Sequence, residues 1–243
     1  MKSSKNFISP KSRALKPEEL YGVYKTLKKY FGHQKWWPGE TPFEIIIGAI
    51  LTQNTAWTNV ELAIINLKKK KVLTPTAMYA MPEKKLAQLI KPAGYFNVKA
   101  KRIRNFLRFL FDRYQGDLPK MFQQNTDDLR KEILSVNGIG PETADSILLY
   151  AGNHLSFVID AYTKRIFSRH RFRLADLERK KIIHNPSKIM RIDYETWRHN
   201  FSENLPPERD LFNDFHAQIV AVGKRFCKVR KPLCSECPLG IYL

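Results

Sequence analysis

The segment Leu134–Arg165 constrains this chain more than any other part of it, because a glycine turn and a helix start follow each other there. Gly138 and Gly140 flank Ile139, and glycine lets backbone N–H groups approach a ligand at little steric cost. The apolar residues after Thr143 recur at helical spacing, and the dipole at the start of such a helix favours an anion. The segment therefore predicts a site for a phosphate-sized anion at the turn.

Asp160 closes the apolar run 157–159 of the same segment and stands before a helical pattern that begins near Ala161. Taken separately, the glycine turn has an ordinary explanation as a link between helices, and Asp160 has one as the N-cap of the next helix. An anion site followed by a carboxylate at the end of an apolar run is a more specific combination than either feature alone.

The combination resembles the helix-hairpin-helix and Gly/Pro-Asp signature of the endonuclease III superfamily of DNA glycosylases. The resemblance implies that Asp160 serves cleavage of the glycosidic bond. It also implies that the DNA backbone is held by a hairpin whose residues include Gly138, Ile139, Gly140 and Thr143.

Two further segments extend this resemblance over roughly Thr41 to Cys237. ILTQNTAWTNV at 50–60 is similar to the superfamily segment whose glutamine enters the DNA stack when a nucleotide is flipped out, which implies this role for Gln53. IKPAGYFNVKAKRIR at 90–104 resembles the segment before the hairpin and adds Lys99 as a DNA-binding residue.

Charge is consistent with a polyanionic partner. The chain has 42 Lys and Arg residues against 23 Asp and Glu residues, a formal net charge of +19, and the positive charge is spread from Lys25 to Lys231, which predicts a broad basic face. RNA, DNA and acidic membranes would all satisfy charge alone. No apolar run approaches the length of a membrane span. Because charge does not distinguish these partners, the choice of DNA rests on the motifs.

Helical spacing dominates the chain and alternating strand patterns are scarce, which predicts an all-α fold. The resemblance implies two helical lobes with an active-site cleft between them: 41–152 with the helix-hairpin-helix, and 17–40 with 153–243. Residues 1–16 are expected to form a flexible basic arm, and 170–207 contains no motif that we can interpret. The predicted helices are 17–30, 42–51, 56–68, 82–90, 98–114, 126–134, 142–150, 161–169 and 210–226.

The chemistry implied for Asp160 is compatible with a single carboxylate. It can stabilise positive charge developing on the sugar, and it can orient or deprotonate water; the sequence leaves both roles open. Bifunctional members of the superfamily carry a lysine shortly after the hairpin, which attacks the sugar and forms an imine. Glu142 stands at that position here and cannot form an imine, which predicts a monofunctional enzyme without lyase activity.

The base pocket is expected among aromatic residues. KWWP at 35–38 and LTQNTAW at 51–57 resemble the 3-methyladenine DNA glycosylase III branch, which implies that Trp57, followed by Trp37 and Trp36, stacks on an electron-poor alkylated purine. Each indole has an alternative place in the core. A looser resemblance adds Lys224, whose alternative is a surface lysine; His216 is predicted to share its helix face or to be an interior histidine.

The cysteines Cys227, Cys234 and Cys237 resemble the four-cysteine iron–sulfur loop of endonuclease III, but Leu243 stands in the fourth place. A [4Fe–4S] cluster normally uses four thiolates. The alternatives are a cluster with a substitute ligand, another metal, or none, and no cofactor is expected to be required for catalysis.

The leading hypothesis is a monofunctional base-excision glycosylase for alkylated purines such as 3-methyladenine or 7-methylguanine. It is expected to act on damaged double-stranded DNA as a cytoplasmic, DNA-associated monomer. Alternatives are a mismatch or oxidised-base glycosylase of the same superfamily, and a non-catalytic helix-hairpin-helix DNA-binding protein.

Overall fold

The computed structural model describes residues 15–172 and 185–242. The regular structure of these residues is helical throughout, with no strand, which confirms the all-α prediction. The described residues form two compact units, one made of residues 15–36, 157–172 and 185–242 and the other of residues 37–156. Each unit is described separately below.

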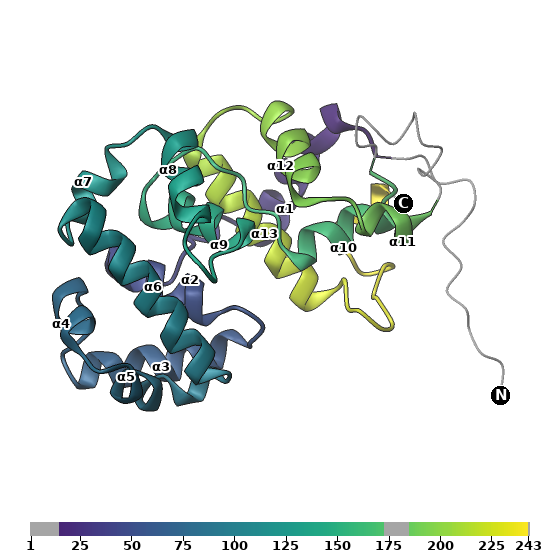
Figure 1. Ribbon diagram of the computed structural model, residues 1–243. Helices are drawn as coiled ribbons and strands as arrows, with labels where there is room; N and C mark the ends of the chain where they lie inside the picture. Colours follow the sequence, from purple (N-terminus) through teal and green to yellow (C-terminus); the bar gives the residue numbers. More distant parts are fainter. Residues whose placement is uncertain (1–14, 173–184, 243) are drawn as a thin grey trace, which may run out of the picture. The chain divides into compact units, whose positions relative to one another are not determined.

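The unit 37–156 holds the hairpin and all six expected DNA-binding residues, and its helices α2 to α9 are labelled in Figure 1. The elements of this unit are α2 (Pro42–Leu51), α3 (Trp57–Lys69), α4 (Pro75–Ala80), α5 (Glu83–Leu89), the 3-10 turn η2 (Lys91–Ala93), α6 (Phe96–Tyr114), α7 (Leu118–Phe122), α8 (Thr126–Leu134), α9 (Pro141–Ser146) and the π-helical segment η3 (Ile147–Ala151). The glycine turn lies between α8 and α9.

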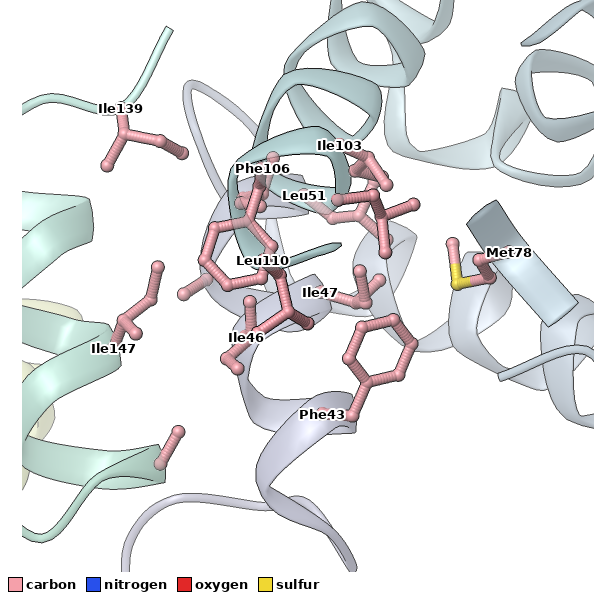
Figure 2. Close-up of a cluster of buried hydrophobic side chains, with 14 of the residues drawn as sticks. Phe43, Ile46, Ile47, Leu51, Met78, Ile103, Phe106, Leu110, Ile139 and Ile147 are labelled. Atoms are coloured by element: carbon pink, nitrogen blue, oxygen red, sulfur yellow. The ribbon is translucent and has the colours of Figure 1, made fainter. Parts of the chain in front are cut away.

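Helix α2 forms the centre of this unit. Its sequence PFEIIIGAIL is apolar on nearly every side, as expected of a helix surrounded by others, and its N-terminus is capped by Thr41, whose hydroxyl accepts from the Glu44 N–H. Figure 2 shows Ile46 and Ile47 of α2 near Leu110 of α6, within one buried cluster. The core therefore fixes the end of α2, which leads directly into Gln53.

The other unit contains α1, the part of the chain from Phe157 onward and the expected catalytic carboxylate. Its centre is aromatic: Phe157, Phe167 and Phe215 are fully buried and contact one another or Phe201. Its elements are the 3-10 turn η1 (Pro17–Glu19), α1 (Leu20–Phe31), α10 (Ala161–Arg169), α11 (Pro186–Met190), α12 (Tyr194–Glu203), α13 (Arg209–Arg225) and the 3-10 helix η4 (Pro238–Tyr242).

The stretch 170–207, which the sequence left without a role, contributes to this aromatic core. Trp197 of α12 is fully buried and stacks on Phe172 with ring centroids 6.0 Å apart. Residues 173–184 of this stretch, and the arm expected at 1–16 as far as residue 14, lie outside the described residues.

Candidate functional site

The hairpin between α8 and α9 depends on Gly138. Its φ of +95° lies in the region that favours glycine, and a Cβ there would lie 2.4 Å from Cγ of Arg102. Gly140 differs, because its φ is −94° and a Cβ there would have no heavy atom within 4 Å. Gly138 is thus required by the fold of the turn, whereas Gly140 leaves open space beside the backbone.

Ile139 anchors the hairpin from inside. Its side chain belongs to the buried cluster (Figure 2), and its N–H donates to the Val136 carbonyl at 3.0 Å. The prediction of Ile139 as a DNA-binding residue therefore needs correction: both its side chain and its N–H are occupied within the protein.

Gln53 lies in the turn after α2, and its amide joins that turn to the hairpin. Its Nε2 donates to the Gly138 carbonyl at 3.1 Å and to Oγ1 of Thr143 at 2.9 Å. Its Oε1 accepts from Nη1 of Arg102 at 2.6 Å. The structure thus brings Gln53 together with two predicted hairpin residues, and an insertion of Gln53 into DNA would first have to break these hydrogen bonds.

Lys99 is in the interior, which contradicts its assignment as a DNA-binding residue. Only 1% of its surface is exposed, and its Nζ donates to the carbonyls of Leu51 at 2.8 Å and Ala93 at 2.7 Å. Burial, with a smaller contribution from the charge of Arg102, lowers the pKa of Lys99 to about 8. Lys99 therefore joins the end of α2 to η2 and does not reach a phosphate.

A buried ion pair fixes the two helices of the hairpin against each other. Arg130 of α8 donates through Nε to Oδ1 of Asp145 in α9 at 2.7 Å and through Nη2 to Oδ2 at 3.1 Å. The Ser156 hydroxyl donates to the same Oδ1 at 2.5 Å. Such a bidentate pair is geometrically specific, so the hairpin is held at both its turn and its base.

Asp160 is the N-cap of α10 and is 8% exposed. Its Oδ1 accepts from the Thr163 N–H at 2.7 Å and the Thr163 hydroxyl at 2.8 Å, while Oδ2 lies 3.6 Å from Nε2 of His216. Burial raises the pKa of Asp160, but His216 and the two Thr163 donors outweigh it, and the net pKa lies below the usual value. Asp160 is therefore an ionised, buried carboxylate as well as a cap.

Trp37 and Trp57 lie together in the unit 37–156. Their ring centroids are 5.1 Å apart at a right angle, and Trp37 also lies 5.0 Å from Tyr150 of η3. Gly48 of α2 makes room for both indoles, because a Cβ there would lie 3.4 Å from Trp37 and 3.5 Å from Trp57. Gln53 and Trp57 do not share a helix, since α3 begins at Trp57, so their separation of four residues does not place them one helical turn apart.

Trp36 and Lys224 belong to the other unit, where the Lys224 ammonium lies 6.0 Å from the ring centroid of Trp36. The loop that leads to Trp36 is held by α13, because Asp214 accepts from the Gln34 N–H at 2.7 Å and Gln218 donates to the Gly32 carbonyl at 2.6 Å. Lys224 and Trp36 thus lie near each other within this unit, and their expected place at a base pocket stays a prediction.

The cysteine loop does not fit a four-thiolate cluster. Nη1 of Arg169 donates to Sγ of Cys227 at 3.0 Å, and Leu243, at the fourth place, has no thiol. Within residues 15–172 and 185–242, no group of three or more His, Cys, Asp and Glu side chains is arranged to hold a metal ion.

Three residues of the unit 37–156 were not identified from the sequence. Arg102 and Tyr150 carry no local motif, and only the fold brings them to Gln53 and Trp37. Tyr95 precedes α6 with a φ of +46° and is 67% exposed, an uncommon backbone conformation for a bulky residue. The sequence offered one signal for Tyr95, which lies in the segment 90–104 that resembles the part of the superfamily before the hairpin.

A helical fold with a glycine hairpin and a capped, ionised carboxylate defines the class to which this chain belongs. Residues 47–191 match the HhH-GPD superfamily base excision DNA repair protein family, and the chain is a member of that family. None of the helices in the described part of the chain is long and apolar enough to cross a membrane.

Among its relatives, "Putative DNA repair glycosylase MJ1434" of Methanocaldococcus jannaschii is 45% identical over 91% of this chain and 94% of its own length. Endonuclease III of Thermotoga maritima is 28% identical over 81% of this chain and 79% of its own length. The structure of H. pylori 3-methyladenine DNA glycosylase (MagIII) bound to 1,N6-ethenoadenine is similar with a TM-score of 0.64 and 26% identity, over 87% of this chain and 98% of that one.

Proposed function

We propose that this protein is a monofunctional DNA glycosylase that hydrolyses the N-glycosidic bond of alkylated purines, such as 3-methyladenine or 7-methylguanine, in double-stranded DNA. The product is an abasic site. The observation that carries the proposal is the state of Asp160, a buried carboxylate with a lowered pKa. Its Oδ1 accepts two hydrogen bonds from Thr163, and its Oδ2 lies 3.6 Å from Nε2 of His216.

The proposed reaction needs little from the protein beyond this carboxylate. The purine leaves with the electron pair of the glycosidic bond, and positive charge develops at the anomeric carbon of the sugar. An ionised Asp160 stabilises that charge in a site of low dielectric. Water then adds to the anomeric carbon and loses a proton, for which the carboxylate is an available acceptor. An alkylated purine is already electron-poor, so a separate general acid for the leaving base is not needed.

The preference for an alkylated purine is supported by the aromatic group Trp37, Trp57 and Tyr150. Flat, electron-rich rings attract an electron-poor or cationic base by stacking and cation–π interaction. Lys224 works in the opposite sense at Trp36, because its ammonium lies 6.0 Å from that ring and repels a cationic base. We therefore assign the selection of a cationic purine to the group around Trp37 and not to Trp36.

The absence of lyase chemistry is supported by the residues at hand. Glu142 occupies the place of the attacking lysine of bifunctional members, and a carboxylate forms no imine. Lys164, shortly after Asp160, donates through Nζ to the Ile192 carbonyl at 2.9 Å, and Lys99 is buried on two carbonyls. Both ammonium groups already have structural partners.

The test is a panel of duplexes that each contain one lesion: 3-methyladenine, 7-methylguanine, an oxidised base or a mismatch. Released base and cut strand are measured separately. We expect base release from the alkylated purines, strand cutting only after alkali, and no covalent complex on treatment with borohydride. Efficient borohydride trapping would overturn the monofunctional assignment, and release confined to oxidised or mismatched bases would overturn the substrate class. A folded Asp160→Asn variant that still releases base would overturn the role of Asp160.

A further inference from the structure

We propose that His216 of α13 is a positioning residue for Asp160, which holds the reactive carboxylate oxygen in place. This inference rests on the proposed catalytic role of Asp160. It concerns the side of the carboxylate that the helix cap leaves available, and it gives a function to a histidine that would otherwise count as part of the core.

The two oxygens of Asp160 have different partners. Oδ1 accepts two hydrogen bonds, from the N–H and the hydroxyl of Thr163, at 2.7 and 2.8 Å. A carboxylate oxygen offers about two lone-pair sites, so Oδ1 is saturated by the cap. Oδ2 is therefore the oxygen that must contact water or the sugar cation. It is also the oxygen that lies 3.6 Å from Nε2 of His216.

The distance of 3.6 Å is longer than a good hydrogen bond. Contacts of catalytic groups are often long in the free enzyme and shorten when substrate binds. Both side chains are nearly enclosed, with exposed fractions of 6% for His216 and 10% for Asp160, so water screens their interaction little. A small movement of the carboxylate would complete the hydrogen bond.

The backbone around the pair is well fixed. Helix α13 packs on α10, and Gly223 of α13 allows the close approach, since a Cβ there would lie 2.1 Å from the Tyr162 ring. His216 thus approaches Asp160 from within a helix, whereas Asp160 stands immediately before the first residue of α10 as its N-cap. A group that controls orientation is best placed on such an element.

Three titratable groups on the neighbouring elements have hydrogen-bond partners other than Asp160. Lys164 of α10 donates to the Ile192 carbonyl, and the Tyr194 hydroxyl of α12 accepts from the Ile159 N–H. Asp214, two residues before His216 on α13, accepts from the Tyr24 hydroxyl and the Gln34 N–H. Within residues 15–172 and 185–242, His216 is the ionisable side chain that forms an ion-pair contact with Asp160.

The test uses the full chain and single-turnover excision of 7-methylguanine from a duplex, measured between pH 4 and 9. His216→Leu removes the imidazole, and His216→Gln retains a donor near Nε2 but cannot be charged. His199→Gln, at an exposed histidine of α12, is the matched control, and Asp160→Asn reports on the proposed function itself. Circular dichroism and thermal melting show which variants are folded.

We expect His216→Leu to lower the excision rate about 10- to 100-fold, less than the roughly 10²–10⁴-fold of a group that transfers a proton itself. The acid limb of its pH profile should move to higher pH, because the remaining carboxylate loses a partner that favours its ionised form. His216→Gln should recover part of the rate without recovering the wild-type acid limb. His199→Gln should match the wild type in both respects.

Two outcomes distinguish a failure of the His216 proposal from a failure of the proposed function. If Asp160→Asn is inactive while both folded His216 variants keep the wild-type rate and acid limb, His216 has no positioning role and the proposed function stands. If Asp160→Asn remains active, the proposed function itself fails. Should His216→Leu not fold, His216→Gln decides alone: a lowered melting temperature with an unchanged acid limb would mean that His216 is merely structural.

Discussion

At the scale of single residues, Asp160 combines a helix cap with an ionised carboxylate, and these two properties support each other. The same Thr163 donors that satisfy the start of α10 also lower the pKa of Asp160. A cap is therefore a suitable place for a carboxylate that has to remain charged although it is buried. The ordinary explanation of Asp160 and the functional one are compatible.

The stability of the protein should depend on this ionisation. Because the pKa of Asp160 is lower in the folded protein than its usual value of 3.8, the unfolded chain binds the proton more readily. The carboxylate's contribution is complete above the usual value and is lost as the pH falls through the folded pKa. We expect the melting temperature of the wild type to fall relative to Asp160→Asn when the pH is lowered from 5 to 3. Parallel melting curves over this range would contradict the lowered pKa.

Lys99 gives a second prediction at this scale. Lys99→Met leaves the carbonyls of Leu51 and Ala93 without their donor, which should cost about 1–3 kcal/mol of the free energy of unfolding, measured in urea. The salt dependence of DNA binding should not change, because no phosphate contact is lost. Lys101→Met, at an exposed position two residues later, is the control. A reduced salt slope for Lys99→Met alone would restore Lys99 to the DNA-binding surface.

At the scale of elements, the two glycines of the hairpin should behave differently. Gly138→Ala combines a positive φ with a clash against Arg102 and should lower the melting temperature as well as DNA affinity. Gly140→Ala meets no neighbour within 4 Å and should leave the melting temperature unchanged, while its methyl group hinders a phosphate. Both losses of affinity should be independent of the lesion, since phosphate contacts carry no sequence information. If Gly140→Ala bound undamaged DNA as well as the wild type does, the phosphate site would not be at Gly140.

The C-terminal loop should be held by arginines of α10 and not by a cluster. Arg169 donates to Sγ of Cys227 and to the carbonyls of Lys228 and Val229. We expect Arg169→Met to lower the melting temperature and Cys237→Ser to leave it unchanged, and we expect anaerobically purified protein to contain no stoichiometric iron or acid-labile sulfide. Four irons per chain, together with an unstable Cys237→Ser variant, would show that the loop holds a cluster.

Helices with a clear capping residue and regular apolar spacing could be predicted from the sequence. Helices that are buried on all sides were predicted less well. The predicted bounds 161–169 coincide with α10 because Asp160 caps it and its apolar spacing is regular. The helix expected at 142–150 is instead α9 followed by the π-helical η3. All residues of η3 are buried, so apolar spacing could not reveal the change of helix type. The short helices α4 and α7 have too few residues for a periodic signal.

At the scale of the whole molecule, the sequence predicts which residues belong to the candidate site, but it does not predict which of them contact one another. Gln53, Gly138 and Asp160 are each marked by a local motif. Gln53 and its partner Arg102 are 49 positions apart in the sequence, and Asp160 and His216 are 56 positions apart. Only packing determines such pairs, because local spacing says nothing about side chains so distant in sequence.

The net charge of +19 leads to the last prediction. Every phosphate that Lys or Arg neutralises releases counterions, so the logarithm of DNA affinity should fall linearly with the logarithm of salt concentration, with a slope of about −0.9 per contact. Stacking of a damaged base on Trp37 and Trp57 adds little to this slope. With Asp160→Asn as a non-cleaving protein, titrations between 50 and 400 mM salt should give parallel lines for undamaged DNA and for a duplex with a neutral, stable analogue of 3-methyladenine. If the lines converged as salt increased, the preference for the lesion would be electrostatic, and the aromatic pocket would not be its source.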